Sequence, residues 1–115
     1  MFTFNFKEVV YFLGTIIVIE KVSGNSVKAT ATVIANMSVD SIGVKSFVIQ
    51  ENDGSGWEPV KGPVTDLKVS VRGNTVTLSF TGTPGYRYRA KGTLYAAKSG
   101  YPTYSETKTS NVVTR

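Results

Sequence analysis

The segment Leu-Lys-Val-Ser-Val-Arg-Gly-Asn-Thr-Val-Thr-Leu-Ser-Phe, residues 67–80, contains two runs in which apolar and polar residues alternate. In the second run, Val76, Leu78 and Phe80 alternate with threonine and serine, which gives an extended strand one apolar face. The dipeptide at 73–74 between the runs is Gly-Asn, a strong turn signal. We therefore predict a tight β-hairpin here, with Val76, Leu78 and Phe80 facing the interior.

Similar signals recur along the chain, with turn residues about every 8–12 positions. Residues 27–35 alternate after the Gly-Asn turn at 24–25, and residues 44–51 carry Phe47 and Ile49 opposite Val44 and Val48. A strand that is apolar on both faces is expected to be central in its sheet. After the turn cluster at 52–56, a short strand should run from residue 57 to 60 and break at Lys-Gly-Pro, 61–63.

The longest expected strand covers residues 86–97, and the last covers about 105–113. The residues of the longest strand that should face inward are Tyr88, Ala90, Gly92, Leu94 and Ala96. The composition agrees, because β-branched and aromatic residues dominate and leucine occurs at only four positions. The 115 residues have room for one core. We predict an all-β protein, a two-sheet antiparallel β-sandwich of about 7–9 strands.

The first twenty residues are unusually apolar. Phe2, Phe4 and Phe6 alternate with polar residues, and the eleven-residue run 9–19 is interrupted only by Gly14 and a threonine. A membrane-spanning helix needs about 20 apolar residues, so this run is too short to be one. No small-residue cleavage site follows it, which argues against a signal peptide. We expect a buried strand pair bent near Gly14, with region 1–20 packed on or extending a sandwich domain at 21–115, or mediating homo-oligomerisation.

The sequence also excludes several kinds of chemistry. It has no cysteine and no histidine, so it lacks thiol nucleophiles, zinc–thiolate sites and the usual general base near neutral pH. It has no phosphate-binding glycine loop and no nucleophile elbow. We expect no enzyme activity, no cofactor and no metal. The net charge of +5 is ordinary for a small domain, and we do not expect nucleic acid as the partner.

The motif Pro-Gly-Tyr-Arg-Tyr-Arg-Ala at 84–90 resembles the Pro-Gly-x-x-Tyr signature of fibronectin type III domains, which are immunoglobulin-like sandwiches. The resemblance implies that Tyr88 forms a tyrosine corner, in which its hydroxyl bonds to backbone a few residues upstream. Those domains usually have a leucine shortly before Pro-Gly, whereas Gly82 and Thr83 stand there in this chain.

A second resemblance covers residues 26–113. The order of a Ser/Thr/Ala-rich strand, Val-Ile-Gln-Glu-Asn-Asp-Gly-Ser-Gly-Trp (48–57), the Pro-Gly motif and Thr-Lys-Thr-Ser-Asn-Val-Val-Thr (107–114) is similar to small, uncharacterised β-sandwich domains exported by Gram-positive bacteria. This implies an extracellular or cell-surface location. The composition itself leaves a cytoplasmic location open.

Two groups of residues suggest a binding surface. Arg87, Arg89 and Lys91 should point from one face at intervals of about 6.5–7 Å, as a cationic ladder for an anionic polymer. In the alternative interpretation, these cations pair with carboxylates such as Glu51 or Glu106 on adjacent strands.

The second group is aromatic and could stack sugar rings, although half-buried structural roles are the alternative. Its members are Trp57, Tyr86, Tyr95, Tyr101 and Tyr104. The oxygens of Glu51, Asn52 and Asp53 lack the spacing of a calcium loop, and turn chemistry explains them.

These observations predict a non-catalytic extracellular or cell-surface binding or adhesion module, with a carbohydrate or cell-wall polymer as its ligand. The alternative is a structural, self-assembling component of a surface or phage particle that uses its apolar N-terminal strand.

Overall fold

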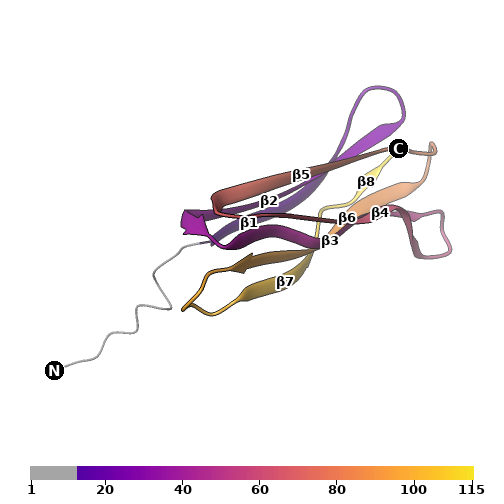
Figure 1. The fold of residues 1–115 in the computed structure, drawn as a ribbon. Coiled ribbons are helices and arrows are strands. Elements are labelled where there is room, and N and C mark those ends of the chain that lie inside the picture. The colour runs from indigo at the N-terminus through magenta and orange to yellow at the C-terminus, as the bar shows by residue number, and fades with distance from the viewer. Residues whose placement is uncertain (1–12) are drawn as a thin grey trace.

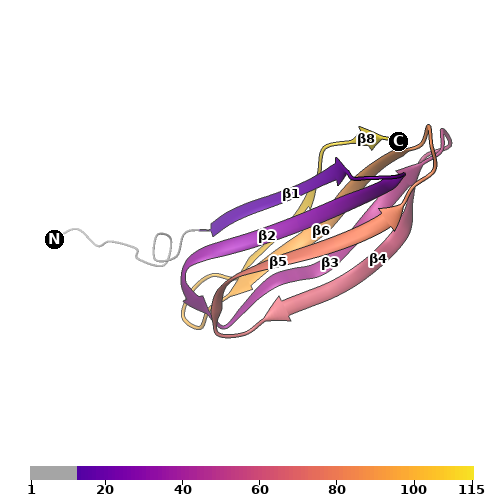
Figure 2. The ribbon, with the colours of Figure 1, turned by 90° about the horizontal axis from the view of Figure 1, so that it is seen from above.

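A computed structural model describes residues 13–115, which form two antiparallel sheets. The strands are β1 (Leu13–Lys21), β2 (Ser26–Val39), β3 (Ser41–Asn52), β4 (Trp57–Lys68), β5 (Val71–Thr81), β6 (Arg87–Ala97), β7 (Tyr104–Thr109) and β8 (Val113–Thr114). One sheet has the order β1-β2-β5, and the other has the order β4-β3-β6-β7 with β8 also paired to β6 (Figure 1). The two sheets lie in separate layers, as Figure 2 shows from above, in an arrangement consistent with a sandwich. The predicted all-β class with two antiparallel sheets is confirmed.

The core lies between the sheets and follows the predicted alternation. On β2, every second residue from Val27 to Ala35 is buried, and on β6 the five predicted inward residues, from Tyr88 to Ala96, are all buried. The face predicted from residues 76–80 is also inward, with Val76 and Leu78 buried and Phe80 half-buried. Burying a large aliphatic or aromatic side chain contributes about 1.5–3 kcal/mol, so these rows hold the sheets together.

The predicted hairpin at 73–74 is wrong. Gly73 and Asn74 lie inside β5, opposite Ile34 and Val33 of β2, and the chain turns at residues 69–70 instead. That turn joins β4 to β5, which belong to different sheets. The Gly-Asn pair serves packing: a Cβ on Gly73 would lie 3.2 Å from the carbonyl oxygen of Val33, and the Asn74 amide is buried.

Two further strand predictions need correction. The strand from Trp57 does not end at residue 60, because β4 continues through Lys-Gly-Pro to Lys68 with shifts in its register against β3. Proline is compatible with such an edge strand because its missing N–H can face away from the sheet. Val44 was expected opposite Phe47, yet both are buried. A register shift after Val44 supplies the extra residue that turns both side chains inward.

Strand β1 is the described part of the apolar N-terminal region. It pairs with β2 along its whole length, with Ile17 and Ile19 buried and Ile16 and Val18 exposed. Burial therefore applies only to alternate residues, and Gly14 lies within this strand. The alternating phenylalanines at 2–6 and the apolar residues 9–12 lie outside the described residues.

The expected last strand is divided into β7 and β8 because Asn111 between them serves another contact. Its side-chain carboxamide accepts a hydrogen bond from the Ile19 N–H (3.1 Å) and donates one to the Ile19 carbonyl oxygen (2.9 Å). The Lys108 ammonium similarly donates to the Thr15 hydroxyl (2.7 Å). These bonds attach the edge of β1 to the end of the five-stranded sheet.

Tyr88 makes the upstream backbone bond predicted for it. Its fully buried side chain accepts a hydrogen bond from the Thr83 N–H (2.7 Å) and donates one to the Glu51 carboxylate (2.6 Å). Gly82 makes room for the ring, because a Cβ there would lie 2.9 Å from the Tyr88 ring. The glycine that departs from the family pattern is thus required by this packing.

We expect Tyr88→Phe to lower the free energy of unfolding at pH 7 by about 1–3 kcal/mol, because Thr83 loses its acceptor and Glu51 its donor. Chemical denaturation would measure the change. Tyr104→Phe is the matched control, since the half-buried Tyr104 hydroxyl is bonded to the side chains of Glu106 and Thr15 rather than to backbone, and its loss should cost less than about 1 kcal/mol. Equal effects of the two substitutions would contradict this role of Tyr88.

The difference in stability between wild type and Tyr88→Phe should also depend on pH. Burial and, secondly, the hydrogen bond to Glu51 raise the pKa of Tyr88 above its ordinary value of about 10. The fold therefore favours the neutral phenol. The stability that this group contributes to the folded state is complete below about pH 10 and is lost as the pH rises through its raised pKa. The stability difference between wild type and Tyr88→Phe should narrow only above about pH 10.

Candidate functional site

The predicted cationic ladder lies on the outer face of the five-stranded sheet. Because Tyr88 and Ala90 face the core, the alternating residues Arg87, Arg89 and Lys91 must face outward. Their direct partners in the neighbouring strands are all uncharged: Asn52 and Thr114 beside Arg87, Gln50 beside Arg89, and Val48 and Thr109 beside Lys91. The three cations are therefore not neutralised by the residues opposite them.

The alternative, that Glu51 and Glu106 pair with these cations, is wrong. Glu51 lies opposite Tyr88 and Glu106 opposite Leu94, so both acids alternate away from the outward face. Their carboxylates instead accept hydrogen bonds from tyrosine hydroxyls. In residues 13–115 the one ion pair is Glu20–Lys28, at 3.9 Å, on the other sheet.

The Trp57 ring contacts the two arginines of the cationic ladder. The Arg89 guanidinium carbon lies 4.1 Å from the centroid of the Trp57 ring, and that of Arg87 lies 5.6 Å from it. The Arg89 Nε–H also donates to the Gln50 side-chain oxygen, at 2.7 Å. A cation over an indole face is held by about 0.5–1 kcal/mol at an exposed site. We call Arg87, Trp57, Arg89 and Gln50 the arginine–tryptophan cluster.

The aromatic residues do not form one continuous platform. Tyr95 lies on the outward face near the end of β6. Trp57, on β4, lies near Arg87 at the start of β6. Because a strand rises about 3.4 Å per residue, the two rings are far apart along the sheet. The Lys45 ammonium lies over the Tyr95 ring, 4.1 Å from its centroid. Tyr86 and Tyr104 pack against the core. Tyr101 lies in the loop between β6 and β7, and sugar binding by any of these residues stays a prediction.

In the turn at residues 52–56, the side-chain oxygens of Asn52 and Asp53 accept hydrogen bonds from other residues of the same turn. Asn52 Oδ1 accepts hydrogen bonds from the N–H groups of Gly54 and Gly56, and Asp53 Oδ1 accepts from the hydroxyl and the N–H of Ser55. The Ser55 hydroxyl, followed by its N–H, holds the pKa of Asp53 below its ordinary value. Across residues 13–115 we find no cluster of three metal-ligating His, Cys, Asp or Glu side chains.

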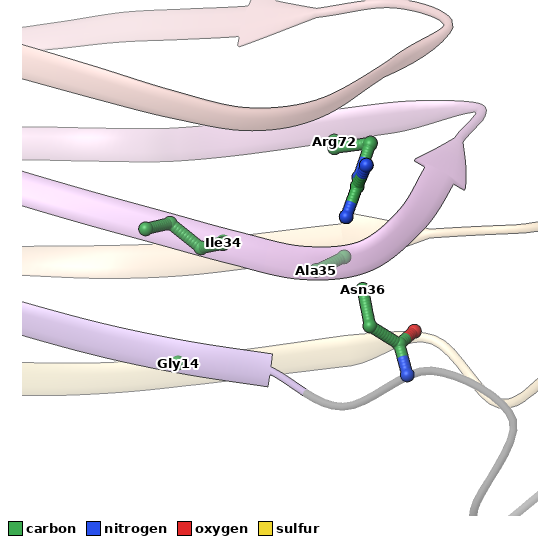
Figure 3. Close-up of a pocket in the computed structure, with 5 residues that line it drawn as sticks. All are labelled: Gly14, Ile34, Ala35, Asn36 and Arg72. Carbon is green, nitrogen blue, oxygen red and sulfur yellow. The ribbon is translucent and has the colours of Figure 1, made fainter.

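Two features of the surface were not foreseen. One is the participation of Lys45 and Gln50 in the cationic face, which depends on how β3 is aligned with β6. The other is an apolar hollow of about 380 Å³ on the three-stranded sheet, shown in Figure 3. It is lined by Gly14, Ile34, Ala35, Asn36 and Arg72. Ile34 could have signalled it, as an apolar residue on the mostly polar side of its strand.

Comparison with known proteins identifies no relatives: no protein-family description, curated protein or solved structure matches the chain. Within residues 13–115, no helix has the length and apolar character needed to cross a membrane.

Trp57 is the chain's single tryptophan, so its fluorescence reports directly on the cluster. We expect Arg89→Met to shift its emission to longer wavelength and to increase acrylamide quenching, because the guanidinium no longer covers the ring. Stability should fall by about 0.5–1 kcal/mol, the contribution of one exposed cation–π contact. Arg72→Met, which changes an arginine on the other sheet, is the control. An unchanged emission spectrum in Arg89→Met would show that the stacked geometry is absent in solution.

Proposed function

We propose that this protein is a non-catalytic extracellular or cell-surface module that binds an anionic carbohydrate polymer on the outer face of its five-stranded sheet. One observation carries the proposal: Arg87, Arg89, Lys91 and Lys45 share this face, and none of them forms an ion pair within residues 13–115. Repeated cations at intervals of about 6.5–7 Å suit a partner that repeats its negative charges.

The fold supports a binding role. The strand orders β1-β2-β5 and β4-β3-β6-β7, together with the Tyr88 hydroxyl bound to upstream backbone, resemble those of fibronectin type III and immunoglobulin-like domains. We propose membership of this broad class, and with it the location outside the cell. The chain's lack of histidine and cysteine favours binding over catalysis.

A triple substitution tests the proposed surface. We expect wild type to bind polygalacturonate, a carboxylate-bearing polysaccharide, but not neutral dextran, with affinity falling as salt is added. Arg87→Ser/Arg89→Ser/Lys91→Ser should weaken binding by about tenfold or more, because three charge-assisted contacts are lost. Calorimetric titration at about 0.1 M salt, where charges more than about 10 Å apart are largely screened, would measure both.

The control is Lys21→Ser/Lys68→Ser/Arg72→Ser, which removes the same charge away from the cationic face. Polygalacturonate binding should stay within about twofold of wild type, since separated surface charges interact weakly across salt solution. Equal weakening by the two triple variants would mean that net charge alone attracts the polymer, and the proposed site would be rejected.

A second candidate function is self-assembly through the three-stranded sheet. Its outer face carries Ile16 at 53% and Ile34 at 55% exposure, together with the partly exposed Val18. The register places them on one face: Ile16 lies opposite Thr32 and Val18 opposite Thr30, which alternate with the buried residues of β2 as Ile34 does. Grouped exposed aliphatic side chains are typical of protein contact surfaces.

If the chain self-assembles through this face, light scattering should show a mass that rises with concentration, and Ile34→Thr should reduce the association. Val69→Thr is the matched control, because Val69 is 69% exposed but lies in the turn between β4 and β5. A monomeric mass at all concentrations would remove this second function.

A further inference from the structure

The arginine–tryptophan cluster restricts the kind of anion that the proposed site recognises. This inference rests on the proposed function and deepens it. We propose that the ligand is a phosphate-bearing carbohydrate or polyol polymer, and that it is recognised through its phosphate groups rather than through its sugar rings.

Arg89 is held in position before a ligand binds. The guanidinium carbon lies 4.1 Å from the Trp57 ring centroid, and the Nε–H group is bonded to Gln50, so the ring and the amide together restrict the movement of this side chain. No hydrogen bond to its terminal Nη groups occurs within residues 13–115, so these donors are directed to solvent as a fork. A fixed fork of this kind matches the oxygen spacing of phosphate and carboxylate groups and loses less entropy on binding than a free arginine.

A second guanidinium, that of Arg87, approaches the same ring. Arg87 lies two residues before Arg89 on β6, and its guanidinium is 5.6 Å from the Trp57 centroid. Two guanidinium groups on one indole can converge on a single anion. A planar carboxylate offers two oxygens in one plane, whereas the oxygens of a phosphate are arranged tetrahedrally and can meet two forks in different planes. The pair therefore favours phosphate.

The aromatic rings on the outer face of this sheet are in contact with cations. Trp57 has Arg89 over its face, and Tyr95 has Lys45 over its face at 4.1 Å. Stacking of a sugar or a nucleic-acid base on the ring face that a cation occupies would displace that cation. The outward aromatic residues of this sheet thus serve to position cations, which favours recognition of charge and disfavours single-stranded nucleic acid.

Charge-conserving substitutions separate a guanidinium fork from a point charge. We expect wild type to bind inorganic polyphosphate at least about fivefold more tightly than polygalacturonate of equal charge and at equal ionic strength, because only phosphate engages both forks. In Arg87→Lys/Arg89→Lys this preference should disappear, so that the two polymers bind about equally, since lysine keeps the charge without the fork. The control is Lys91→Arg, which should keep the preference.

Each outcome decides a different claim. Equal binding of the two polymers by wild type, or a preference that survives in the double lysine variant, would overturn the phosphate assignment and leave the anionic-polymer function intact. Binding of neither polymer at low salt would overturn the function as well. Binding of single-stranded DNA more than about tenfold tighter than polyphosphate of equal charge would show that bases are stacked, and would overturn the assignment in favour of nucleic acid.

Discussion

Burial of one side of β6 is the constraint on which both the core and the candidate site depend. Its residues Tyr88, Ala90, Gly92, Leu94 and Ala96 are enclosed between the sheets. Since side chains alternate along an extended strand, this burial forces Arg87, Arg89 and Lys91 together onto the opposite face. The apolar interior and the cationic surface are thus two consequences of the same strand, and a shift of one residue would destroy both.

Buried and bridging polar groups connect the two sheets as well. The Asn74 amide on β5 donates to the carbonyl oxygens of Ile42 (3.3 Å) and Asp66 (3.0 Å) on the other sheet. Gly43 is required beside it, because a Cβ there would collide with the Asp66 carbonyl oxygen and crowd the Asn74 amide. The Asn111 bonds to Ile19 close the opposite side. Directional bonds of this kind select one alignment of the sheets, which apolar contact alone specifies less precisely.

The electrostatic character of the outer face follows from where the acids lie. Glu51 and Glu106 lie on β3 and β7, the strands that pair with β6, yet each lies opposite an inward-facing residue of β6, Tyr88 or Leu94. Both guanidinium groups approach the Trp57 ring despite their like charge, at 5.6 Å and 4.1 Å from its centroid. Cation–π attraction and the Gln50 bond offset the repulsion between these two like charges.

For β2, β6 and residues 75–80 of β5, the sequence by itself determined that the chain is extended and which side of the strand is apolar, because alternation is a local property of the chain. It therefore predicted the two-sheet class, the inward row of β6 and the outward position of Arg87, Arg89 and Lys91. Only the tertiary structure decided which strands are neighbours, and so it placed Gly73 and Asn74 inside β5, Trp57 beside Arg89, and Glu51 away from the cations. Strand pairing, register shifts and the passage from one sheet to the other depend on contacts between distant segments, which local patterns do not encode.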